Sequence, residues 1–301
     1  MAKRLTASEY MIMLYTMFMF VLVAGAFLYG FKMGTETTTA KYLEKSKVTE
    51  KLENDLISYD QDHLITLYFT VYTPFRTVQK AWFDTYQGIL LKTNTFDDIN
   101  NISDIAKSAK EKLSLLKVPS SSPLLVSAQQ NYLKSLTIFE KVFKEFKPTK
   151  GENNADVLKK LESSASFVVA ANFSLQAQQD YFDAVIKWNE KVSNKPLNGV
   201  NEIDGPKTGI ALWNVMNLNV KNAVTAHYLH QNKVFSIYMP QDLTINVESL
   251  LQEHPKTNII QDIMDSLIKT NAVRNGDFIK DRTIYYSSEV LPQIPFFSKI
   301  Q

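Results

Sequence analysis

The sequence contains no cysteine, and this absence excludes several kinds of chemistry. Without thiols the chain can form no disulfide, no thiolate metal site and no covalent intermediate on a cysteine nucleophile. The chain therefore needs no oxidising compartment in order to fold, although it would tolerate one.

Glycine and proline are also scarce, at 9 and 10 residues among 301. So few glycines disfavour a turn-rich β sandwich and a loop that cradles phosphate groups. The remaining composition is ordinary, with 45% hydrophobic and 21% charged residues. This length can form one large domain or two small ones.

Neither sign of charge is in excess beyond the N-terminal region. The rest of the chain has 30 basic and 30 acidic residues once the N-terminal Lys3, Arg4, Lys32 and Glu9 are set aside. A protein that binds nucleic acid normally carries a basic excess or a basic patch. We therefore predict that nucleic acid is not a partner.

Motifs that carry catalysis are missing as well. The sequence contains no Gly-x-Ser-x-Gly nucleophile elbow, no phosphate-binding P-loop, no His-Glu-x-x-His and no Glu-x-x-His pair. On these grounds we predict a protein that is not an enzyme and has no cofactor, and we assign no catalytic residue.

One long stretch without charge lies near the N-terminus. Its 22 residues, Tyr10 to Phe31, read YMIMLYTMFMFVLVAGAFLYGF. As a helix they would extend about 33 Å, which matches a bilayer core of roughly 30 Å. We predict an uncleaved transmembrane helix over residues 10–31, a signal-anchor. A signal peptide cleaved near Ala24-Gly25-Ala26 and a buried soluble helix are the alternatives.

The flanking charges indicate the orientation of this helix. The short tail of residues 1–9 carries Lys3, Arg4 and the terminal amine, whereas residues 33–40 contain neither lysine nor arginine. Because basic residues favour the cytoplasmic side, we predict a cytoplasmic N-terminus and an extracytoplasmic bulk. The predicted location is the cell membrane in a single pass, with the lipid bilayer as partner.

Small residues recur at every fourth position near the end of this segment. Ala26, Gly30 and Gly34 would share one face of a helix and allow another helix to approach closely. This pattern permits a homodimer or a pairing with another membrane protein. The alternative is the ordinary frequency of glycine and alanine in membrane helices.

Beyond the membrane segment the apolar residues follow helical periods. The predicted fold class is all-α, with an extended antiparallel bundle of the four-helix type. Residues 32–193 are predicted to form a stalk and this bundle, residues 194–206 a linker, and residues 207–301 a smaller helical region packed on the bundle. The predicted elements are helices over 41–72, 75–92, 102–117, 125–146, 155–192, 208–231, 243–253 and 257–271, and an extended tail over 285–301.

Within this plan, some details are specific enough to test. Pro74 is predicted to break or kink the first helix, and the helix over 102–117 is predicted to be a minor element. Residues 155–192 are predicted to form one long helix. Residues 234–239 (VFSIYM) are interpreted as a short strand or an apolar linker.

Aromatic residues are unusually dense between residues 68 and 86. Such a cluster can line a ligand pocket or an interface, and it can equally be a packed core around Pro74, the interpretation that we prefer. The candidate pocket or interface residues are Tyr72, Phe75, Arg76, Trp82 and Tyr86.

The chain has only four histidines. His227 and His230 are three residues apart on a predicted helix and would share a face, and His63 in YDQDH is the one comparable further ligand. Histidines beside an aromatic core explain the pattern without a metal. We therefore assign no metal site and keep these three as candidates.

Three functional hypotheses follow. The first is a non-enzymatic interaction or adaptor module, anchored in a bacterial membrane and binding another envelope or membrane protein. The second is a ligand-sensing ectodomain that works with a membrane partner, because the predicted cytoplasmic tail is too short to signal alone. The third is a metal-binding helical bundle. A solid bundle core favours the first, and a cavity beside Trp82 favours the second.

Overall fold

A computed structural model describes Met19 and residues 57–149, 151–205, 207–253, 259–287, 289 and 291–297, without the side chains of Glu253 and Phe296. The predicted membrane segment, residues 10–31, lies outside this part of the chain except for Met19. The stalk predicted from residue 41 onward lies outside it up to residue 56. Among the described residues, no helix is both long and apolar enough to cross a membrane.

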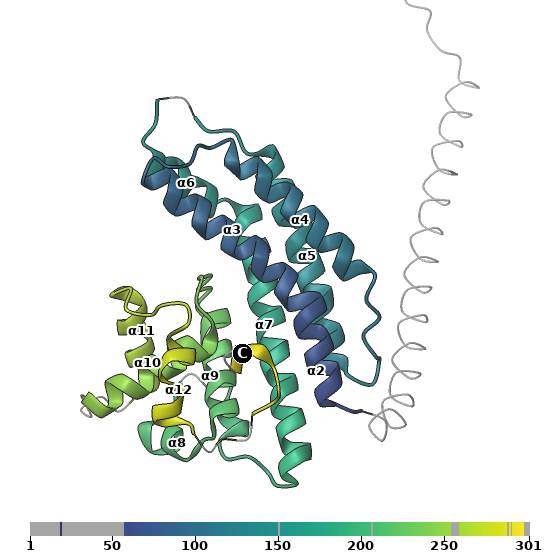
Figure 1. Cartoon of the computed structure of the whole chain (residues 1–301), viewed down its shortest axis with the longest axis vertical. Helices are drawn as coiled ribbons and strands as arrows, with labels where there is room; N and C mark the ends of the chain where they lie inside the picture. Colours follow the sequence, from purple (N-terminus) through teal and green to yellow (C-terminus); the bar gives the residue numbers. More distant parts are fainter. Residues whose placement is uncertain are drawn as a thin grey trace, which may run out of the picture. The chain divides into compact units, whose positions relative to one another are not determined.

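The described residues form an all-α fold, as predicted, and contain no strand. Residues from Ser58 onward make up one compact unit. Its first part is a bundle of long helical segments that lie side by side (Figure 1). These segments are α2 (Gln61–Leu67) continued by the π-helix η1 (Tyr68–Tyr72) and α3 (Thr73–Leu90), then α4 (Asp98–Ser114), α5 (Pro123–Glu145) and α7 (Ala165–Ser193).

Hydrogen bonds between the helices show that neighbours run antiparallel. Ser103 in α4 donates to the carbonyl oxygen of Glu140 in α5 at 2.9 Å, while Gln129 near the start of α5 donates to the carbonyl oxygen of Leu113 at the end of α4, also at 2.9 Å. The prediction that the helix over 102–117 is minor was wrong. It packs against both α3 and α5, and Ile99, Ile102 and Leu113 on its inner face are at most 1% exposed.

Pro74 does not break the first helix. The helix continues from Gln61 to Leu90, and the turn before the proline widens into η1. A proline inside a helix removes one backbone donor and its ring collides with the carbonyl four residues earlier. A π turn relieves that collision by moving the carbonyl away. The hydroxyl of Thr73 also donates to the carbonyl oxygen of Tyr68 at 3.0 Å.

Two predicted helices are each divided in two. The stretch 155–192 forms α6 (Asn154–Glu162) and α7, separated by Ser163 and Ser164, and Ser164 caps α7 by accepting from the amide of Phe167 at 3.4 Å. The stretch 208–231 forms α8 (Ile210–Val215) and α9 (Leu218–Gln231), and Asn217 caps α9. Residues 234–239 form no strand and connect α9 to α10, as the linker interpretation expects.

The C-terminal part is built around α9. Every residue of this helix from Leu218 to Leu229 is buried. It packs between α7 and α10 (Pro240–Glu253), and α10 in turn contacts α11 (Ile260–Lys269) and α12 (Asp277–Tyr285). The short helix η2 (Val200–Glu202) lies between α7 and α8. The described residues after α12 form no helix except a single turn, η3 (Pro295–Phe297), in line with the non-helical tail that was predicted.

A buried carboxylate joins α10 to the start of α12. Asp242 is 2% exposed. Its side chain accepts three backbone N–H groups, from Met239 at 2.9 Å, Phe278 at 3.0 Å and Gly276 at 3.1 Å. Burial raises the pKa of Asp242 to about 6, although these hydrogen bonds and the charge of Arg76 act in the opposite direction.

This pKa has a consequence for stability. A carboxyl with a raised folded-state pKa stabilises the fold fully below its unfolded pKa, near 3.8, and loses that contribution as the pH rises through about 6. We expect the difference in unfolding free energy between the wild type and Asp242→Asn to change by about 2 kcal/mol between pH 4 and pH 6.5. Urea unfolding at several pH values measures it, and a constant difference would contradict the assignment.

Candidate functional site

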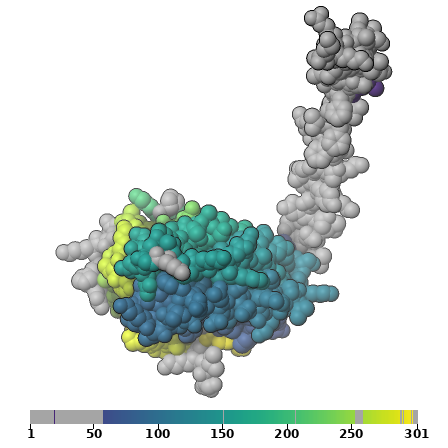
Figure 2. Space-filling model, turned by 90° about the horizontal axis from the view of Figure 1, so that it is seen from above, coloured from purple at the N-terminus to yellow at the C-terminus, as the bar shows by residue number. Residues whose placement is uncertain are grey.

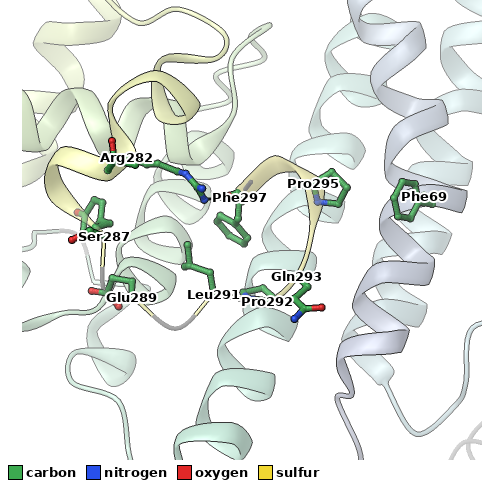
Figure 3. Close-up of a pocket in the computed structure, with 11 residues that line it drawn as sticks. Phe69, Arg282, Ser287, Glu289, Leu291, Pro292, Gln293, Pro295 and Phe297 are labelled. Carbon is green, nitrogen blue, oxygen red and sulfur yellow. Dashed lines mark hydrogen bonds between the residues drawn. The ribbon is translucent and has the colours of Figure 1, made fainter. Parts of the chain in front are cut away.

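A groove of about 450 Å³ lies where the tail passes the first helical segment. Phe69 of η1 lines one side, and α12 with the tail lines the other (Figure 3). Figure 2 shows the yellow C-terminal residues alongside the blue residues of the first helices. The lining residues are Phe69, Arg282, Thr283, Tyr286, Ser287, Glu289, Leu291, Pro292, Gln293, Pro295 and Phe297.

The tail is held in this position by contacts at several points. The amide of Gln293 donates to the side-chain oxygen of Gln61 at 3.2 Å, and a guanidinium nitrogen of Arg282 donates to the carbonyl oxygen of Phe297. The ring of Phe297 packs edge-on against Phe278 at 5.9 Å between centroids, and Ile294 is fully buried. The tail is therefore an integral wall of the groove.

Phe69 stands between this groove and a second one. The second groove, of about 460 Å³, is lined by residues of η1, α3 and α4, including Thr73, Pro74 and Ile105. The side chain of Phe69 is 55% exposed, although its neighbours Tyr68 and Tyr72 pack inward. Phe69 follows Tyr68 directly in the chain, so it lies off the buried stripe of this helix and faces water. An exposed aromatic ring beside concave surface is typical of a protein-binding site.

A buried ion pair lies behind the groove. Lys221 of α9 and Glu248 of α10 are 2.8 Å apart, and their side chains are 7% and 15% exposed. The same oxygen of Glu248 accepts from the indole of Trp213 at 2.7 Å and from the hydroxyl of Tyr286 at 2.6 Å. The Lys221 nitrogen lies 5.4 Å and 5.3 Å from the ring centroids of Trp213 and Tyr286. This network fixes Tyr286, which belongs to the groove wall.

Two groups in the groove wall, Tyr286 and Glu289, keep their protons to a higher pH than such groups ordinarily do. Burial, followed by the negative charge of Glu248, raises the pKa of Tyr286 far above its ordinary value. Burial also raises the pKa of Glu289, against the backbone N–H of Leu218 and the charge of Lys221. The phenol therefore stays protonated and donates to Glu248.

The histidine candidates lie in three different settings. His63 approaches the hydroxyl of Ser122 at 3.1 Å. His227 contacts Asp183 and Asp204, and His230 contacts the side-chain oxygen of Gln179 at 2.7 Å. The structure thus gives each ring its own polar partners. Among the residues that it describes, no cluster of three or more potential ligands is arranged to hold a metal ion.

The aromatic candidates lie in the bundle interior. Tyr72, Phe75 and Trp82 are at most 4% exposed, whereas Tyr86 is half-buried. Burial raises the pKa of Tyr72, whose hydroxyl donates to the sulfur of Met239. Arg76 reaches outward and donates to the carbonyl oxygen of Ile237 at 2.7 Å, which ties α3 to the segment before α10.

Sequence reasoning did not find the groove or the network behind it. Trp213, Lys221, Glu248 and Tyr286 are widely separated in the chain, and α9 has polar residues on every side, so no period marks Lys221 as buried. Phe69 belonged to the dense aromatic run but carried no distinguishing signal. The membrane-packing candidates Ala26, Gly30 and Gly34 lie outside the described residues.

Comparison with known proteins gives no family assignment. No protein-family model matches the chain, and neither curated proteins nor solved structures yield a match. The case for a function therefore depends on the residues and geometry described above.

Proposed function

We propose that the chain is a membrane-anchored, extracytoplasmic interaction module of a bacterial envelope, which binds another membrane or envelope protein and is not an enzyme. The uncharged run over residues 10–31 supports the anchor. The compact unit from Ser58 onward supplies the binding surface. The proposed partner-binding surface is centred on Phe69 and the two grooves beside it.

One observation carries the proposal, namely that the aromatic interior is filled while an aromatic side chain outside it is exposed. The ring centroid of Trp82 lies 5.4 Å from that of Phe143 and 5.1 Å from that of Phe167, and the indole is 1% exposed. Phe69, in contrast, is 55% exposed between two grooves. A protein surface can bury such a ring as a central anchor.

The second candidate, a ligand-sensing ectodomain, requires an internal binding cavity. The sequence placed that cavity beside Trp82, where the aromatic rings of Phe143, Phe167 and Tyr86 pack against the indole. This packing favours the interaction module over the sensor. The open grooves beside Phe69 are surfaces available to either function.

Photo-crosslinking in cells tests the partner-binding surface. A photoreactive residue replaces Thr73, which lines the second groove, in the full-length chain with and without Phe69→Ala. We expect a discrete crosslinked species whose yield falls tenfold or more in Phe69→Ala, because an interface anchor contributes about 2 kcal/mol or more. Equal yields would refute a role for Phe69.

Two controls separate the parts of the proposal. Leu91 is 73% exposed and lines neither groove, so a photoreactive residue there should give no crosslink that depends on Phe69. Extraction of membranes at alkaline pH tests the anchor independently. Recovery of the protein in the soluble fraction would overturn the membrane assignment and leave the crosslinking result intact.

A further inference from the structure

Both ring nitrogens of His227 contact carboxylates from different segments. Nε2 lies 2.8 Å from Asp183 of α7, and Nδ1 lies 2.5 Å from Asp204, in the connection between η2 and α8. The His227 side chain is 6% exposed. A neutral imidazole has one N–H group, so only the doubly protonated ring can donate to both carboxylates at once.

The pKa values of His227 and of its neighbour His230 shift in opposite directions. Burial lowers the pKa of His227, but the hydrogen bonds and charges of Asp183 and Asp204 outweigh it, so the pKa lies above its ordinary value of 6.5. Burial and then the charge of His227 lower the pKa of His230, against the charge of Asp180. Tyr59 is a further titratable group near Asp183. Burial, and to a smaller extent the charge of Asp183, raise the pKa of its phenol.

We propose that His227 is a pH-dependent latch, which ties the connection between α7 and α9 to α9 itself through Asp204 and releases Asp204 when the ring loses a proton. Asp204 is the carboxylate that is released because its side chain is 82% exposed, whereas that of Asp183 is 24% exposed. Water replaces the lost hydrogen bond at Asp204 with little cost, and the remaining N–H of the ring keeps its bond to Asp183.

The direction of the effect follows from the raised pKa of His227. The latch contributes its full stability below the ordinary value of 6.5 and loses it as the pH rises through the raised value. At low pH, His230 also becomes charged one turn away, and two like charges then oppose each other. The latch is therefore closed most firmly below pH 6.5 and above the lowered pKa of His230.

Release is confined to a short segment. Ile203 stays 8% exposed in the core, and the amide of Gly205 donates to the carbonyl oxygen of Glu202 at 2.9 Å without involving the histidine. Neither contact contains a group that titrates near neutral pH. The connection is therefore expected to loosen around Asp204 while α7 and α9 stay packed.

Amide hydrogen exchange of the full chain across pH 6 to 9, corrected for intrinsic base catalysis, tests the latch. We expect protection of the amides around Asp204 to fall about tenfold for each unit by which the pKa of His227 in the wild type exceeds its pKa in Asp204→Asn. Asp204→Asn should remove this dependence, and because position 204 is exposed the variant keeps its fold. The turn over residues 91–94, in which the amides of Thr93 and Asn94 donate to the carbonyl oxygen of Gly88, is the internal control.

Imidazole nitrogen resonances give the second readout, and the chain has only four histidines to assign. We expect His227 to titrate above its ordinary pKa in the wild type and closer to that value in Asp204→Asn. A protection profile that is the same in both proteins, or a His227 that titrates below 6.5, would overturn the proposal.

Discussion

Replacing Glu248 by alanine is expected to lower the free energy of unfolding by about 3–5 kcal/mol, since it leaves a buried cation without its counter-charge. Lys221 is 7% exposed at its side chain, and Trp213 and Tyr286 lose the same acceptor. Each buried donor that is left unpaired adds to the cost. Urea unfolding followed by far-ultraviolet circular dichroism measures the change.

The matched control removes both charges together. Lys221→Met with Glu248→Leu exchanges the ion pair for apolar side chains of similar size, and such exchanges are often neutral or stabilising. We therefore expect the double variant to be more stable than Glu248→Ala alone. If Glu248→Ala costs less than about 1 kcal/mol, the pair is solvated and the expected buried network does not exist.

The second large effect is expected at the centre of the bundle. Trp82→Ala should cost about 3–5 kcal/mol, because it removes a fully buried ring and leaves a cavity among Phe143, Phe167 and Tyr86. Part of that cost depends on how far these rings can close the gap. Thermal and urea unfolding of the variant measure the loss.

Two comparisons make this result specific. Leu115 is 84% exposed, so Leu115→Ala should change the stability by no more than about 0.5 kcal/mol. Trp82→Phe keeps part of the packing and should fall between the two. A loss at Trp82→Ala that does not exceed the loss at Leu115→Ala would mean that the aromatic interior is not closely packed, and the sensor hypothesis would regain support.

Helix positions in the bundle were predictable where large apolar residues recur at helical spacing. Leu125, Tyr132 and Phe139 lie on one stripe of α5 and are all buried, and Pro123 occupies the first turn, where proline is tolerated. Ser122 is the N-cap residue of this helix, but its side chain makes no capping hydrogen bond. Its hydroxyl donates to the carbonyl oxygen of Ser58 instead, a contact across the chain that no local pattern reveals.

Helix breaks were less predictable, because they depend on what lies beside them. The break at Ser163 and Ser164 cannot be seen in the spacing of the apolar residues. Both α6 and α7 bury an apolar stripe, and the helical spacing runs from one into the other along the sequence. Pro74 carried a strong local signal for a break. The surrounding contacts of Tyr72 and Phe75 keep the helix running through it with one widened turn.

The sequence by itself determined the all-α class, the helical bundle, the absence of thiol chemistry and the uncharged stretch from which an anchor is proposed. All four depend on composition or on periods within one segment. Only the tertiary structure decided that Lys221 meets Glu248, that Phe69 is exposed between two grooves, and that His227 bridges Asp183 and Asp204. These arrangements join residues from separate helices, and their free energy comes from burial and pairing that exist only after the helices have packed.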